Sequence, residues 1–100
     1  MPNIALYRPH VTFHKAKQSY FTHDNQVYPV ADAPTEVFKA AVLALAPHWA
    51  DSEVYGPLIA NPEDLAERWF LLCGLCELGR AMKLYSCREE AEQALGIVVR

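Results

Sequence analysis

The alternation of apolar and polar positions in the first third of the chain predicts β-structure. Within residues 3–30, apolar residues such as Val11 and Phe13 alternate with their neighbours, and β-branched and aromatic residues are frequent, which is typical of strands. The polar run at residues 23–26, His-Asp-Asn-Gln, stands between two apolar stretches, and Asp and Asn tolerate the geometry of tight turns. We therefore expect antiparallel strands here, with a hairpin turn at residues 23–26.

From residue 35 the apolar residues recur at helical spacing. Asp32 or Thr35 can cap a helix, Pro34 suits its first turn, and Pro47 stops it. These signals predict a helix over residues 35–46.

A second and longer helix is predicted over residues 62–78. Asn61 is a capping residue, and it is followed by a proline and two acidic residues, which are favourable in a first helical turn. Gly79 suits the end of this helix. Between the two helices, residues 48–60 are expected to be irregular, with a turn at Gly56 and the proline that follows it.

The last fifth of the chain carries weaker signals. Residues 80–85 are predicted to form a strand, and Ser86 with Glu89 matches a capping box for a short helix that runs through Leu95. Residues 97–99, Ile-Val-Val, are predicted to form a final strand.

These elements predict a small α+β fold. Antiparallel N-terminal strands with a hairpin precede two main helices and a C-terminal strand, short helix and strand. No repeat, linker or low-complexity tract divides the chain, so we expect one domain over residues 1–100.

Composition places this domain in the cytoplasm. Hydrophobic residues make up 52% and charged residues 21% of the 100 residues, which is typical of a globular protein. The N-terminal residues do not resemble a signal peptide, and the longest apolar stretch, residues 40–47, is far shorter than the roughly 20 residues of a membrane span. Three cysteines in a chain without an export signal are expected to be free thiols in a reducing compartment.

The long helix is expected to bury a stripe of apolar residues that includes both cysteines of a C-x-x-C motif. At 100° per residue, one side of this helix carries Leu65, Trp69, Leu72, Cys73 and Cys76. Buried cysteine packs as a small hydrophobic residue, so we favour core packing for the pair over a redox role. A zinc site would need two further ligands, with Cys87 and His48 as the candidates, and we expect no metal or cofactor.

Cys87 is the candidate reactive thiol. It is predicted to lie at the start of the short helix beside Arg88, where the helix dipole and a positive charge favour a thiolate. No sequence feature assigns a base to it.

One side of the long helix indicates a surface for another protein. Phe70, Leu75 and Leu78 are expected to point away from the buried stripe, which predicts that a partner or a second copy of the chain covers them. A patch of acidic residues at the start of the helix, which can meet a basic groove, comprises Glu63, Asp64 and Glu67.

The predicted function is therefore a small protein-binding module, as an inhibitor or regulator, and as a candidate homodimer. A first alternative is a small thiol- or metal-dependent enzyme that uses Cys87 or the pair Cys73 and Cys76. A second alternative is weak binding of single-stranded nucleic acid by the N-terminal sheet. It is disfavoured because that region offers few cations for its aromatic residues and the net charge is −3.

Overall fold

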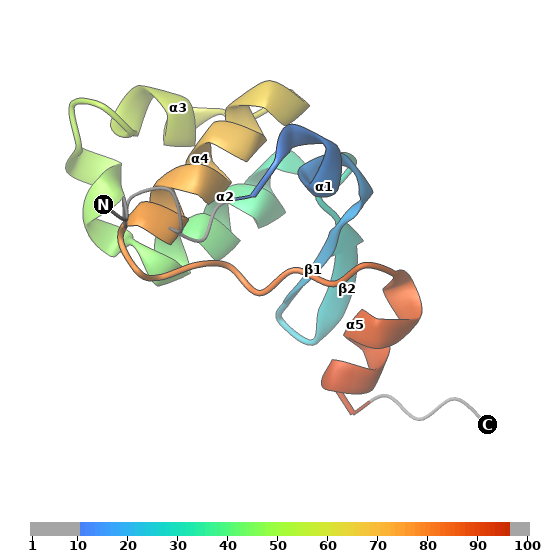
Figure 1. Cartoon of the computed structure of the whole chain (residues 1–100). Coiled ribbons are helices and arrows are strands. Elements are labelled where there is room, and N and C mark those ends of the chain that lie inside the picture. Colours follow the sequence, from blue (N-terminus) through green and yellow to red (C-terminus); the bar gives the residue numbers. More distant parts are fainter. Residues whose placement is uncertain (1–10, 97–100) are drawn as a thin grey trace, which may run out of the picture.

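Helices supply most of the regular structure in the computed structural model, which describes residues 11–96 (Figure 1). In chain order the elements are α1 (Phe13–Gln18), β1 (Tyr20–His23), β2 (Gln26–Pro29), α2 (Thr35–Leu45), the 3₁₀ helix η2 (Pro47–Asp51), α3 (Gly56–Ala60), α4 (Leu65–Glu77) and α5 (Arg88–Ala94). Two antiparallel strands with several helices confirm the α+β class.

The predicted hairpin is confirmed. Strands β1 and β2 pair in antiparallel register, with His23 opposite Gln26. Asp24 and Asn25 form the turn, and their φ angles of 56° and 64° are both positive, as a type I′ turn requires. This turn matches the twist of the strands it joins, so Asp and Asn fix the register locally.

The expectation of a strand around Val11 and Phe13 is wrong. Residues 13–18 form α1 instead, because Thr12 caps the helix by accepting a hydrogen bond of 3.0 Å from the backbone N–H of Lys15. Ala16 is the one residue of this helix that is buried. The predicted strand residues 3–10 lie outside the described part of the chain.

Helix α2 confirms the first predicted helix, although its cap differs. Pro34 occupies the N-cap position and no side chain caps the helix, so neither Asp32 nor Thr35 has the predicted role. The segment at residues 48–60 is more ordered than predicted, since it contains η2 and α3. Gly56 begins α3 instead of forming a turn, because the proline after it is well suited to a first helical turn.

Helix α4 confirms the long helix but begins later than predicted. Asp64, not Asn61, is its N-cap, and a capping box with Glu67 joins the two residues reciprocally. The Asp64 carboxylate accepts a hydrogen bond of 2.8 Å from the backbone N–H of Glu67, whose own carboxylate accepts one of 3.3 Å from the backbone N–H of Asp64.

The buried side of α4 is rotated from the predicted one. Its buried residues are Arg68, Leu71, Leu72, Gly74 and Leu75. The remaining predicted core residues are only half-buried at the edge of the core, namely Leu65, Trp69, Cys73 and Cys76. The centre of the buried side is thus about 100° away from the predicted stripe at the usual 3.6 residues per turn.

The core lies between the hairpin, α2, η2 and α4. Its largest fully buried side chains include Phe21, Phe38, Val42, Trp49, Leu71, Leu72 and Leu75. The rings of Phe21 and Phe38 meet edge to face with centroids 5.7 Å apart, which joins the hairpin to α2.

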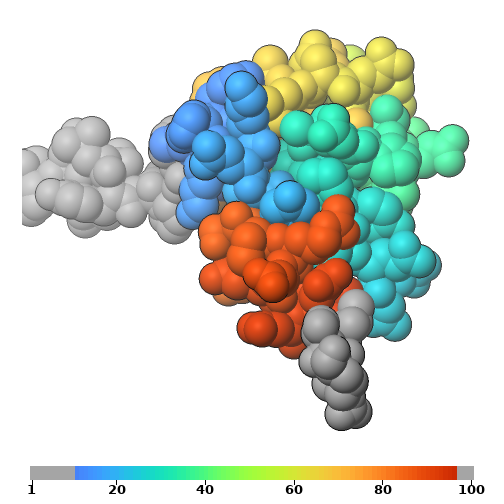
Figure 2. Space-filling view, turned by 90° about the vertical axis from the view of Figure 1, so that its right-hand side faces the viewer, coloured from blue at the N-terminus to red at the C-terminus, as the bar shows by residue number. Residues whose placement is uncertain are grey.

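After α4 the chain crosses the molecule to α5, and residues 80–96 lie against α1 and the hairpin (Figures 1 and 2). The predicted strand at residues 80–85 is wrong except for one bridge between Tyr85 and Tyr20. Helix α5 is confirmed, but Cys87 is its N-cap without a side-chain hydrogen bond. Ser86 bonds to Glu90 instead of forming the predicted capping box with Glu89. The predicted strand at residues 97–99 lies outside the described residues.

Among the helices of residues 11–96, none has the length and apolar character that crossing a membrane requires.

Candidate functional site: a trough beside α1

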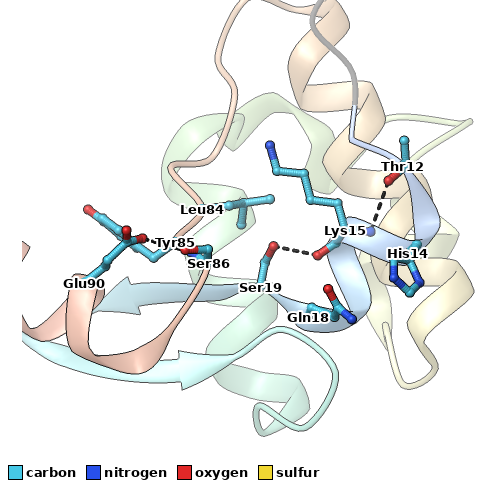
Figure 3. A pocket seen from close by; sticks show the side chains of 9 residues that line it. All are labelled: Thr12, His14, Lys15, Gln18, Ser19, Leu84, Tyr85, Ser86 and Glu90. Atoms are coloured by element: carbon cyan, nitrogen blue, oxygen red, sulfur yellow. Dashed lines mark hydrogen bonds between the residues drawn. The ribbon is translucent and has the colours of Figure 1, made fainter.

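Two adjoining pockets lie between α1 and the segment that precedes α5. The larger, of about 360 Å³, is lined by Thr12, His14, Lys15, Gln18, Ser19, Leu84, Tyr85, Ser86 and Glu90 (Figure 3). The smaller, of about 290 Å³, is lined by Val11, Lys15, Cys76, Ala81, Met82, Lys83 and Leu84. Because Lys15 and Leu84 line both pockets, we treat them as one continuous feature, the α1 trough.

Helix α1 forms one wall of the trough and is held firmly against α4. The indole N–H of Trp69 donates a hydrogen bond of 2.5 Å to the backbone carbonyl of Val11, and the Trp69 ring meets Phe13 edge to face. At the other end of α1, Ser19 is only 3% exposed, and its hydroxyl donates a hydrogen bond of 2.6 Å to the carbonyl of Lys15 (Figure 3). The backbone carbonyl of Ser19 also accepts a hydrogen bond of 2.9 Å from the N–H of Val30, so this wall is positioned by contacts at both of its ends.

The opposite wall is formed by residues 81–86, most of which make no backbone hydrogen bond within the described part of the chain. The N–H and C=O of Tyr85 both bond to Tyr20, at 2.9 and 2.8 Å. Within the described residues, no backbone hydrogen bond involves residues 81–84. Since backbone groups alternate in direction along an extended chain, those of Leu84 point away from β1. The trough thus has the character of an open strand edge.

The charges of the trough differ between its ends. Lys15 and Lys83 are exposed, and the Lys83 ammonium lies 5.8 Å from the centroid of the Tyr85 ring. At the far end, the Glu90 carboxylate accepts hydrogen bonds from the backbone N–H and the hydroxyl of Ser86, at 3.2 and 2.8 Å. The lysine end therefore attracts an anionic group, while the carboxylate at the other end is held by the serine.

The C-x-x-C pair adjoins the lysine end of the trough. Burial raises the pKa of the Cys73 thiol, and a backbone hydrogen bond with Val11 lowers it by less. The Cys73 thiol also donates a hydrogen bond of 3.3 Å to the carbonyl of Val11. Burial also raises the pKa of Cys76, while the charge of Lys15 lowers it. All three cysteines of the chain are free, and each is half-buried.

The ligands of the alternative zinc site do not come together in the structure. Across residues 11–96, no three or more His, Cys, Asp or Glu residues are grouped so that they could hold a metal ion. Cys87 and His48 therefore do not complete a site with Cys73 and Cys76.

Of the three residues predicted to form a partner surface on α4, two are exposed and one is buried. Phe70 and Leu78 are 46% and 43% exposed, and the Phe70 ring lies 6.0 Å from that of Tyr55. Leu75, by contrast, is fully buried, so the expectation that it points outward is wrong. Among the acidic residues, Asp64 and Glu67 are used in the capping box and Glu63 is exposed.

The trough could not be predicted from local sequence, because its two walls are far apart in the chain. No local motif links Ser19 or Lys15 to residues 81–86. The capping signal at Thr12 could have placed α1, and with it one wall.

Comparison with protein-family models, with curated proteins and with solved structures found no match for this chain.

Proposed function

We propose that the protein is a protein-binding module that holds an extended, acidic segment of its partner in the α1 trough. The class of function is the one the sequence analysis predicted. The binding site is different, since it lies beside α1 and not on the face of α4 that carries Phe70 and Leu78.

The observation that carries the proposal is that residues 81–84 make no backbone hydrogen bond with any other residue of the described range 11–96. A partner segment that lies alongside can pair with these N–H and C=O groups as an added strand, which is a common mode of peptide recognition. Each such hydrogen bond contributes about 0.5–1.5 kcal/mol net. The bridge between Tyr85 and Tyr20 anchors the end of this segment to β1.

Charge favours an acidic partner. Lys15 lines both pockets and Lys83 lines one of them, so two ammonium groups stand beside the same stretch of backbone. An Asp or Glu side chain of the partner is expected beside these lysines, and a neutral or basic side chain beside Glu90. Because these charges are exposed, binding should weaken as salt is added.

A role as an inhibitor or regulator follows from such a module as part of the same proposal. We place the protein in the cytoplasm, because three free cysteines suit a reducing compartment.

Selection of peptides from a random ten-residue display library by the immobilised full chain tests the proposal. We expect enriched peptides to alternate apolar and polar residues and to contain Asp or Glu. The double variant Lys15→Glu/Lys83→Glu should bind them at least about tenfold more weakly, a loss of about 1.4 kcal/mol.

The matched control is Lys17→Glu/Lys39→Glu. It makes the same change in net charge at two lysines that do not line the trough. Equal loss of binding in both double variants, or enriched peptides without acidic residues, would contradict the proposal.

A further inference from the structure

Cys76 and Met82 line the small pocket at the lysine end of the α1 trough, and Cys73 bonds to the carbonyl of Val11, which lines the same pocket. Cys73 and Cys76 are three residues apart on α4, a spacing that brings side chains to within about 5–6 Å on one helix face. Met82 lines the same small pocket as Cys76.

Val11 connects the two cysteines. Its carbonyl accepts the hydrogen bond from the Cys73 thiol, and Val11 also lines the pocket that Cys76 and Met82 line. The same carbonyl also accepts the hydrogen bond from Trp69, so it keeps a partner if the Cys73 thiol loses its proton. Cys73 can therefore act as a ligand without leaving a buried carbonyl unsatisfied.

This set of donors suits a soft, monovalent metal ion. Zinc in structural sites takes four ligands from Cys, His and carboxylate side chains, and the described residues offer no group of even three. Copper(I) is selected by thiolate and thioether sulfur and accepts fewer ligands. Copper(I) with two thiolates carries a net charge of −1, which Lys15 and Lys83 at the same pocket offset.

We propose that Cys73, Cys76 and Met82 bind one copper(I) ion. On binding, each cysteine releases its thiol proton to water and no electron is transferred. This inference goes beyond the proposed function and does not rest on it, because the ligands are side chains whereas the partner segment would use the backbone of residues 81–84. The two sites share Lys15 and Lys83, so bound copper(I) and an acidic partner would compete for these charges.

Anaerobic titration of the reduced full chain with copper(I), in competition with the chelator bicinchoninate, tests this site. We expect one ion per chain, with sulfur as the only ligand atom in X-ray absorption spectra. Cys73→Ser and Cys76→Ser should each bind copper(I) more than about 100-fold more weakly, since loss of a ligand exceeds the 10–100-fold effect of losing a supporting contact. Met82→Leu, which keeps the volume and removes the sulfur, should bind about tenfold more weakly.

Cys87→Ser is the matched control and should bind as the wild type does. Circular dichroism establishes that each variant is folded. Three results would overturn the proposal: failure of the wild type to take up copper(I), loss of binding in Cys87→Ser, or nitrogen and oxygen ligands in the spectra. Unchanged affinity in Met82→Leu would also overturn it.

Discussion

The guanidinium group of Arg68 donates a hydrogen bond of 2.7 Å to the backbone carbonyl of Val30, and thereby ties α4 to the chain that follows the hairpin. Its Nε–H donates a second hydrogen bond of 2.8 Å to the carbonyl of Pro62, and its charge lies 5.3 Å from the centroid of the Phe38 ring. Arg68 is only 2% exposed, and burial lowers its pKa. The side chain therefore acts as a buried connection between three parts of the core.

Replacement of Arg68 by Met should destabilise the protein by about 3 kcal/mol, because the carbonyls of Val30 and Pro62 lose their partners inside the core. Urea denaturation measures this loss. The control is Arg80→Met, because Arg80 is exposed and its bond to the carbonyl of Leu45 lies at the surface. That variant should change the free energy of unfolding by no more than about 0.5 kcal/mol. Equal effects at the two arginines would show that Arg68 has no special role.

Leu75 and Leu78 should respond in opposite ways, although both were predicted to face outward. Leu75→Ala should lower the free energy of unfolding by about 2–5 kcal/mol, because it empties a fully buried site. Leu78→Glu should remain folded, as the side chain is 43% exposed. Thermal and urea unfolding of both variants measure the difference, and an unfolded Leu78→Glu would contradict the described packing.

The same Leu78→Glu variant tests the expectation that Phe70 and Leu78 contact a second copy of the chain. If they do, sedimentation should show a dimer for the wild type and a monomer for the folded variant. A folded variant that sediments with the same mass as the wild type would contradict that expectation.

Gly74→Ala should destabilise the protein even though alanine is the better helix former. A Cβ at this position would lie 2.8 Å from the hydroxyl of Tyr55 and 2.9 Å from Cη2 of Trp49. Those two rings are stacked with centroids 3.9 Å apart, so neither moves easily. Overpacking of about 1–3 kcal/mol should exceed the gain of about 1 kcal/mol in helix propensity. Ala66→Gly, at an exposed position of the same helix, measures that propensity alone. A Gly74→Ala variant more stable than the wild type would show that the rings of Trp49 and Tyr55 can shift to accommodate the added methyl group.

Stability should fall in alkaline solution because of Cys73 and Cys76. Burial raises the pKa of both thiols above the ordinary value of 9.0, so the folded protein holds these protons more tightly than the unfolded chain does. The resulting stabilisation is fully present below pH 9.0 and is lost as the pH rises through the folded-state values. Urea unfolding between pH 7 and pH 11 should show this decline. The fall in the free energy of unfolding should be smaller in the double variant Cys73→Ala/Cys76→Ala. An equal fall in that variant would show that other titrating groups cause it.

Local signals predicted the elements well where a turn or cap decides the structure. Asp24 and Asn25 determine the hairpin, and Pro47 ends α2. The buried side of α4 could not be predicted, because its apolar residues extend around most of the helix. Which side is buried depends on Trp49 and Tyr55, which pack over Gly74 from a segment that was expected to be irregular.

The candidate site was beyond local prediction for a related reason. The segment 81–84 is predicted to be part of a strand, but within residues 11–96 only the adjacent Tyr85 pairs with β1, and no backbone hydrogen bond involves residues 81–84. Whether such a segment pairs depends on the elements around it, and no feature of its own sequence determines this.

Amide hydrogen exchange of residues 81–84 tests the binding account most directly. Exchange is measured by NMR in two samples: the full chain without a ligand, and the full chain with an acidic peptide from the library selection. We predict that the Met82 and Leu84 amides exchange fast in the isolated protein and at least about tenfold more slowly with the peptide, because they then donate to its backbone. The amides of Phe70 and Leu78 should not change. Slowing centred on Phe70 and Leu78, with residues 81–84 unaffected, would contradict the account.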